Sequence, residues 1–326
     1  MPAGLGAPPS AGVRAPEVLS IRAADGYELG AYLWRQRAQG SDERSVVIVN
    51  AATSVRCDYY ARFANFLFAR GFDVITYDYR GIGSSRPRSL RNFEASWVDW
   101  GRLDFEAVLQ YASQIFTAHP IDVVAHSIGG FILGFAPSAR HIRRIVTVGA
   151  QHAYWRDYAP AARYKMLLKW HVFMPAVTTL FGYFPGRKLG WLEDTPRGVV
   201  RNWSRASKRF AIARAGGVSA HVEGKELMRH FSEVTADTLA LSLTDDEFGT
   251  VPAIERLLRY FPHSAATHLR IAPRAVSQSR IGHFAFFNEC HEATLWPIAL
   301  DWLRYGRCPA NGPGNIIARG THRAGA

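Results

Sequence analysis

A serine set between small residues is the first feature of the sequence that could do chemistry. Ser127 lies in the motif Ala-His-Ser-Ile-Gly at 125–129, after the mainly apolar, β-branched run 121–125 and before residues 131–135, which are apolar at helical spacing. This pattern predicts a strand, a sharp turn at Ser127 and a helix. The turn would hold the hydroxyl out from the sheet edge and place the amide of Ile128 at a helix N-terminus, where an oxyanion is stabilised. The alternative is an ordinary serine N-cap.

A serine nucleophile needs a base to take its proton and an acid to orient that base. Asp246 lies in Thr-Asp-Asp-Glu, directly after the predicted strand 238–243, and His283 lies in Ile-Gly-His-Phe, beyond the last predicted strand. Because side chains just beyond the carboxyl ends of parallel strands line one crevice, we expect both to lie near Ser127. Asp245 is an alternative acid, since adjacent residues in an extended turn point to opposite sides.

Two further motifs carry a resemblance to a known family. Residues 78–85, Asp-Tyr-Arg-Gly-Ile-Gly-Ser-Ser, are similar to the D-x-R-G-x-G-x-S turn of the α/β-hydrolase fold, and the Gly-His of 282–283 is similar to its histidine loop. Residues 17–305 therefore resemble an α/β-hydrolase with an inserted cap, most of all a bacterial group of uncharacterised predicted serine hydrolases. The order Ser, Asp, His is the order of that fold.

The resemblance implies roles for further residues. The second oxyanion amide would come from Ala52, in the loop after the third strand, with Ala51 and Thr53 as alternatives. The acid would be Asp246, which stands before Glu247 at a turn. Some relatives place the acid where Asp157 stands, but pairing of Asp157 with Arg156 or Arg163 is the alternative we favour. No cofactor is implied.

Strands that alternate with helices predict a mostly parallel, doubly wound sheet. We expect a disordered N-terminus at 1–16, a core at 17–149 and 236–305, a helical cap without strands at 150–235 and a loose tail at 306–326. Within the cap, apolar residues of 166–184 would either pack the cap onto the core or line an acyl pocket. The expected strands are 17–22, 27–35, 45–50, 72–78, 121–125, 142–148, 238–243 and 267–272, and the expected helices are 58–70, 97–116, 251–260 and 293–305.

Composition narrows the classes of protein. The 326 residues carry a net charge of +12, but the arginines are scattered and no nucleic-acid motif accompanies them, so we expect no nucleic-acid partner. No signal peptide or membrane span is expected, and Cys57, Cys290 and Cys308 read as free thiols, which favours a cytoplasmic location. His221 and His230 lack a metal-ligand spacing, so no metal is expected.

The function predicted from these features is hydrolysis of a small-molecule ester or amide by Ser127, His283 and Asp246 through an acyl-enzyme. Two alternatives remain open. An acyltransferase would use the same three residues with an alcohol in place of water. A non-catalytic binding protein could retain the fold, because fold does not fix function.

Overall fold

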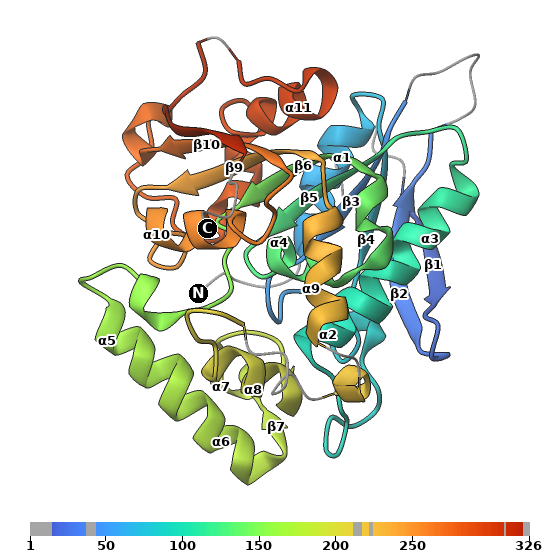
Figure 1. The fold of residues 1–326 in the computed structure, drawn as a ribbon, viewed down its shortest axis with the longest axis vertical. Helices are drawn as coiled ribbons and strands as arrows, with labels where there is room; N and C mark the ends of the chain where they lie inside the picture. Colours follow the sequence, from blue (N-terminus) through green and yellow to red (C-terminus); the bar gives the residue numbers. More distant parts are fainter. Residues whose placement is uncertain (1–14, 37–43, 211–216, 222–223, 310, 322–326) are drawn as a thin grey trace.

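A nine-stranded sheet forms the centre of the computed structural model, which describes residues 15–36, 44–210, 217–221, 224–309 and 311–321. The strand order is β1-β2-β4-β3-β5-β6-β9-β10-β11. Strands β4, β3, β5, β6, β9 and β10 pair in parallel, whereas β1–β2, β2–β4 and β10–β11 are antiparallel (Figure 1). The bounds are β1 Glu17–Arg22, β2 Glu28–Trp34, β3 Val46–Asn50, β4 Asp73–Tyr77, β5 Ile121–His126, β6 Ile142–Val148, β9 Asp237–Leu243, β10 Ala265–Ile271 and β11 Asn315–Thr321. The predicted mostly parallel sheet is confirmed.

Helices cover both faces of this sheet (Figure 1). On one face, Phe63 of α1 packs edge-on against Trp296 of α11, with ring centroids 5.3 Å apart. On the other face, Phe135, which follows α4, packs against Phe231 of α9 (Gly224–Glu233) with centroids 5.0 Å apart. Every residue of β3, β4 and β5 is buried between these layers, as parallel strands covered on both faces must be. The helices outside the β6–β9 connection are α1 Ala61–Phe68, α2 Trp97–Asp99, α3 Glu106–Ile115, α4 Gly129–Ile132, α10 Val251–Leu258 and α11 Trp296–Tyr305.

The prediction of a loose tail at 306–326 is wrong over residues 315–321. These residues form β11, which pairs antiparallel with β10, and Gly314, at φ +99°, supplies the turn that leads into it. The sequence Asn-Ile-Ile-Ala-Arg-Gly-Thr has no period-two pattern, so it gave no strand signal. Backbone hydrogen bonds to an otherwise open sheet edge hold this strand in place.

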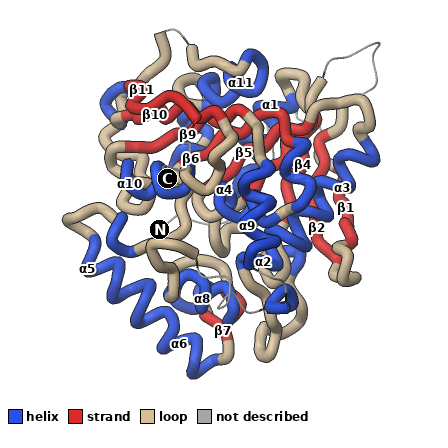
Figure 2. The backbone as a smooth tube through the Cα atoms, in the orientation of Figure 1, coloured by secondary structure: helices blue, strands red, loops and turns tan. Residues whose placement is uncertain are grey.

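The connection between β6 and β9 is mainly helical, as expected, but it also contains two short strands. Tyr183 of β7 pairs with Pro196 of β8, which corrects the expectation of a cap without strands. A continuous helical segment comprises α5, a π-helical turn Leu167–Phe173 and α6, and ends at Gly182, whose φ is +80° (Figure 2). The bounds are α5 Arg163–Met166, α6 Met174–Phe181, β7 Tyr183–Phe184, α7 Gly186–Leu189, β8 Thr195–Pro196, α8 Arg197–Ser204 and α9 Gly224–Glu233. That residues 150–235 act as a cap stays a prediction, and residues 1–14 of the predicted disordered N-terminus lie outside the described residues.

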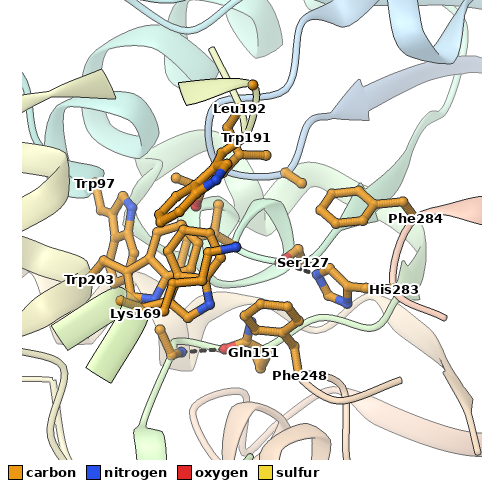
Figure 3. A pocket seen from close by; sticks show the side chains of 16 residues that line it. Trp97, Ser127, Gln151, Lys169, Trp191, Leu192, Trp203, Phe248, His283 and Phe284 are labelled. Carbon is orange, nitrogen blue, oxygen red and sulfur yellow. Dashed lines mark hydrogen bonds between the residues drawn. The ribbon is translucent and has the colours of Figure 1, made fainter. Parts of the chain in front are cut away.

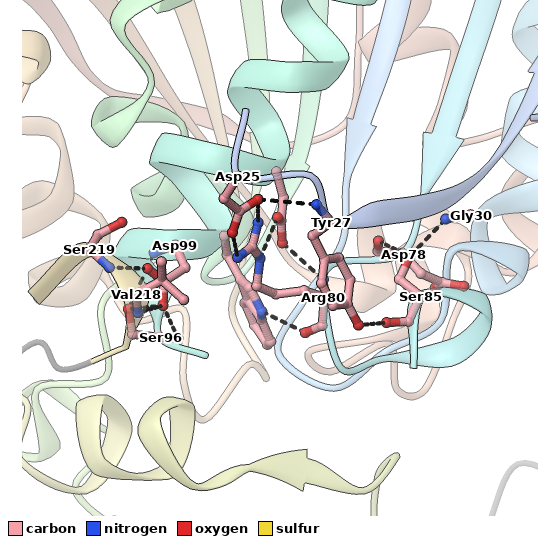
Figure 4. A network of polar contacts seen from close by, with 12 residues as sticks. Asp25, Tyr27, Gly30, Asp78, Arg80, Ser85, Ser96, Asp99, Val218 and Ser219 are labelled. Carbon is pink, nitrogen blue, oxygen red and sulfur yellow. Dashed lines mark hydrogen bonds and ion pairs between the residues drawn. The ribbon is translucent and has the colours of Figure 1, made fainter. Parts of the chain in front are cut away.

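The turn at 78–85 joins the connection between β1 and β2 to the loop that follows β3. The guanidinium of Arg80 is 1% exposed and pairs with Asp104, Nε to Oδ1 at 2.7 Å, and with Asp25, Nη1 to Oδ2 at 2.6 Å (Figure 4). Asp78 Oδ1 accepts a hydrogen bond of 2.7 Å from the amide of Cys57. Because Cys57 ends the loop that follows β3, this turn fixes the position of that loop beside the carboxyl end of β5.

Candidate active site

Ser127 occupies the sharp turn between β5 and α4. Its φ is +54°, a left-handed conformation that is costly for a serine, and its amide donates to the carbonyl of Val148 at 3.0 Å. A Cβ added at Gly129 would lie 2.7 Å from the carbonyl oxygen of Asn50, and one at Gly130 would lie 2.6 Å from the Cβ of Ala150. Small residues are therefore required where the helix leaves the turn, as the sequence pattern predicts.

His283 and Asp246 lie beside Ser127 in a single hydrogen-bonded chain. The Oγ of Ser127 is 2.9 Å from His283 Nε2 (Figure 3). Nδ1 of that ring is 2.8 Å from Asp246 Oδ2. The other carboxylate oxygen accepts the amides of Phe248, at 2.8 Å, and Gly249, at 2.9 Å. Burial raises the pKa of Asp246, but the His283 ring and these amides outweigh it and hold the pKa below its ordinary value. A charged carboxylate thus accepts from Nδ1–H and leaves Nε2 bare to accept the serine proton.

The structure gives the two competing carboxylates other partners. Oδ2 of Asp245 accepts the amides of Ile281, at 2.8 Å, and Gly282, at 2.9 Å, so this side chain holds the loop that carries the histidine. Asp157 forms a bidentate ion pair with Arg256 of α10. The prediction that an arginine pairs with Asp157 is confirmed, but the partner is Arg256, and the expectation of Arg156 or Arg163 is wrong.

His126 links the loop after β3 to the histidine loop. Its Nε2 lies 2.9 Å from the carbonyl oxygen of His283, which can only accept, and its Nδ1 lies 2.9 Å from Tyr60 Oη. Burial and the neighbouring His283 lower the pKa of His126 to about 3, so the ring is neutral and its Nδ1 accepts from the Tyr60 hydroxyl. The same hydroxyl accepts the amide of Ala52 at 2.9 Å. The Ala52 amide is therefore already engaged, which speaks against its predicted role as an oxyanion donor.

A cavity of about 310 Å³ opens beside Ser127 (Figure 3). Its lining includes four tryptophans and two phenylalanines, and its polar side chains include Lys169 and Gln151. Trp170, Trp191 and Trp203 come from the β6–β9 connection, which therefore supplies part of the pocket beside the nucleophile. The lining residues are Ala52, Thr53, Trp97, Ser127, Ile128, Gln151, Ala153, Lys169, Trp170, Gly190, Trp191, Leu192, Trp203, Phe248, His283 and Phe284.

Most of the apolar residues at 166–184 do not line this cavity. Trp170 does, whereas Leu168 is 62% exposed and Leu180 is 80% exposed, with Val172, Phe173 and Phe181 also exposed. Trp191, Trp203 and Phe248, which were not singled out from the sequence, form the wall instead. The available signal was the recurrence of tryptophan after residue 166, but a helical pattern alone could not tell which face is turned inward.

Neither a metal cluster nor a membrane span emerges from the part of the chain that the structure describes. No group of three or more His, Cys, Asp or Glu side chains among those residues could hold a metal ion. Likewise, no helix in those ranges is long and apolar enough to cross a bilayer. The three cysteines are free, and burial raises the pKa of the Cys57 thiol, which disfavours its thiolate.

Comparisons with solved structures identify the same architecture. The structure of DcsB in complex with its substrate analogue aligns with a TM-score of 0.58 at 13% identity, covering 89% of this chain and 99% of that one. The Pyrococcus furiosus esterase Pf2001 gives 0.56 at 12% identity, with 94% and 97% covered. A puromycin-hydrolysing peptidase of Mycobacterium tuberculosis gives 0.56 at 14% identity, with 94% of this chain and 42% of that chain covered. At these identities the likeness concerns the fold.

No curated protein matches the sequence, so the resemblance to a narrower bacterial group stays a prediction. The family model described as alpha/beta hydrolase fold matches residues 45–263, which is more than half of the chain. That match agrees with the parallel sheet and with the sharp turn at Ser127. The chain belongs to the α/β-hydrolase fold family.

Proposed function

We propose that the protein is a serine hydrolase that cleaves an ester or amide of a small molecule through an acyl-enzyme. The observation that carries the proposal is the continuous hydrogen-bonded chain from Ser127 Oγ through His283 to Asp246, at 2.9 and 2.8 Å, beside an apolar cavity. A strained serine conformation is costly, and strain of this kind clusters at active sites.

The reaction follows from the directions of these hydrogen bonds. His283 Nε2 takes the proton of Ser127 Oγ as the oxygen attacks the substrate carbonyl, and Asp246 stabilises the imidazolium that forms. Collapse of the tetrahedral intermediate expels the alcohol or amine, which takes the proton from His283. Water then attacks the acyl-enzyme with the same imidazole as base, and Ser127 is released.

We assign the oxyanion hole to the amides of Ile128 and Thr53. Ile128 directly precedes α4, so its N–H lies at the positive end of the helix. Thr53 lines the cavity together with Ser127, and its amide makes no hydrogen bond to the residues that the structure describes. The Ala52 amide instead donates to Tyr60 Oη, so Thr53 replaces Ala52 in this role. A donor that is free in the resting enzyme can meet the charge when it develops.

A non-catalytic binding protein is the alternative from another functional class. Such a protein does not need a base within hydrogen-bond distance of a strained serine, and here both features are present. An acyltransferase would use the same residues, and it would differ only in accepting an alcohol during deacylation. Product analysis with and without added alcohol separates hydrolysis from transfer.

The test is covalent labelling with a fluorophosphonate probe. The wild-type protein should label at Ser127 and hydrolyse p-nitrophenyl esters. Ser127→Ala should abolish labelling and lower turnover about 10⁴-fold or more, as loss of a nucleophile does. Ser232→Ala is the control, because that hydroxyl bonds to the Arg229 carbonyl of its own helix, α9. Failure of the folded wild-type protein to label, or undiminished labelling of Ser127→Ala, would refute the proposal.

A further inference from the structure

We infer that the cavity beside Ser127 selects substrates that carry a negatively charged group, such as a carboxylate, at the end of an apolar acyl chain, and that Lys169 and Gln151 bind this group. The inference rests on the proposed hydrolase function and names the substrate class. Its basis is the charge and the hydrogen-bonding capacity of the cavity wall.

Lys169 supplies the positive charge. It lies in the π-helical turn Leu167–Phe173, and its Nζ is 4.0 Å from the ring centroid of Trp191 and 4.4 Å from that of Trp170. No carboxylate lies within 4 Å of this ammonium group among the residues that the structure describes. Burial and nearby Lys165 lower the pKa of Lys169, whereas the exposed Glu247 raises it without forming an ion pair. The ammonium group of Lys169 thus lies against two indole faces and has no carboxylate to form an ion pair with among the described residues.

Gln151 supplies hydrogen-bond donors in the same wall. It follows β6, and its own amide donates to the carbonyl of Ser127 at 3.3 Å, which fixes its backbone beside the nucleophile. Its Oε1 accepts the amide of Ala153. The carboxamide oxygen is therefore engaged, and the Nε2 hydrogens remain as donors for a ligand.

The rest of the wall contributes no carboxylate that could pair with a cation. No aspartate or glutamate belongs to the lining, and its ionisable side chains are Lys169 and His283. Several tryptophan and phenylalanine side chains line the cavity (Figure 3). Beside these apolar side chains a charge pair is screened less than it would be in bulk water. A neutral chain would leave the ammonium unpaired, whereas a terminal carboxylate would pair with Lys169 and accept from Gln151.

The alternative is that Lys169 only packs its stem and charge on the two tryptophans. In that case its charge would not discriminate between substrates of equal length. The two accounts differ in the ratio of kcat/KM for a charged and an uncharged ester, not in overall activity.

The experiment compares two p-nitrophenyl esters of equal chain length: the monoester of adipic acid, which ends in a carboxylate, and the hexanoate. We expect the wild-type protein to prefer the adipate monoester. Lys169→Met should lower that preference about 10- to 100-fold, since a charge-assisted hydrogen bond is lost. Gln151→Leu should lower it less, about 3- to 10-fold, because a neutral donor is lost.

Lys165→Met is the matched control, because it removes an equal charge from the same helical segment at a residue outside the cavity lining. The preference should survive in this variant, and melting curves should show that all variants fold. A wild-type ratio near one, or an equal loss in Lys165→Met and Lys169→Met, would overturn the inference. Fluorophosphonate labelling of Ser127 in the same samples separates this outcome from failure of the proposed hydrolase, in which labelling itself would be absent.

Discussion

Replacing each of three carboxylates by its amide distinguishes their roles, and Asp246→Asn is the decisive change. An asparagine can still accept the amides of Phe248 and Gly249 through its carbonyl oxygen, so the turn that carries it should keep its shape. Its NH₂ group would face Nδ1 of His283, which favours the tautomer with the proton on Nε2. That nitrogen could then no longer accept the serine proton.

The magnitude follows from the lost tautomer and the lost charge. The corresponding change in the serine protease triad lowers turnover about 10⁴-fold, which corresponds to about 5.4 kcal/mol in the activation barrier. We expect a loss of this size in kcat of Asp246→Asn, with a melting temperature close to that of the wild-type protein.

Asp157→Asn should show the opposite pattern. It removes the charge from an ion pair with Arg256 whose side chains are 8% and 16% exposed, at an expected cost of about 2 kcal/mol in the free energy of unfolding. For a chain of this length that cost lowers the melting temperature by about 3 °C. Turnover of the remaining folded protein should change less than about threefold, because the pair lies outside the cavity lining.

Asp245→Asn keeps an oxygen that can accept the amides of Ile281 and Gly282, so we expect an intermediate result, a loss of about 10-fold in kcat. The assay is p-nitrophenyl ester hydrolysis at saturating substrate, with thermal melting of the same samples. Near-normal turnover of Asp246→Asn together with collapse in either other variant would refute the assignment, and that other carboxylate would be the acid.

Three further predictions concern the surroundings of the site. Gly149→Ala should lower kcat at least about 10-fold, because its Cβ would lie 2.7 Å from Asp246 Oδ2. Gly71→Ala is the control: its φ is also positive, but no atom lies within 4 Å of the added Cβ, so it should lower stability alone. Deleting residues 315–326 should expose the edge of the sheet and raise the aggregation rate measured by light scattering, while unchanged solubility would contradict the role of that strand. Burial lowers the pKa of His152 to about 4, below the ordinary 6.5, so the stability that the neutral ring contributes is full above pH 6.5 and is lost as the pH falls towards 4. Between pH 6.5 and 4.5, His152→Gln should therefore lose less free energy of unfolding than the wild-type protein, as measured by urea unfolding.

The turn at Ser127 could be predicted because its signal is local. An apolar β-branched run, small flanking residues and an apolar helical stretch lie within fifteen consecutive residues, and together they favour a strand, a sharp turn and a helix. Asp246 and His283 could be placed beside it because each follows a strand of a parallel sheet, and such ends meet at one edge.

The remaining features depend on contacts that no local sequence pattern encodes. The Ala52 amide is engaged by the Tyr60 hydroxyl, eight positions along the chain, because the path of the intervening loop places the two side by side. The partner of Asp157 lies 99 positions away on α10, so no spacing rule could identify Arg256. Likewise, the cavity wall could be predicted only by knowing which face of the helices between β6 and β9 turns inward, and the exposed apolar residues of α6 weaken that signal.

The hydrogen bonds that join the loop after β3 to the histidine loop through His126 all run in one direction. The amide of Ala52 donates to Tyr60 Oη, that hydroxyl donates to His126 Nδ1, and the opposite ring nitrogen donates to the carbonyl of His283. Any replacement at this position must accept on one side and donate on the other across the width of an imidazole. The two loops that flank the nucleophile are thereby held at a fixed distance from each other. The His126 ring sets the spacing between the histidine loop and the loop after β3. Engineering of either loop has to treat both loops and the ring between them as one unit.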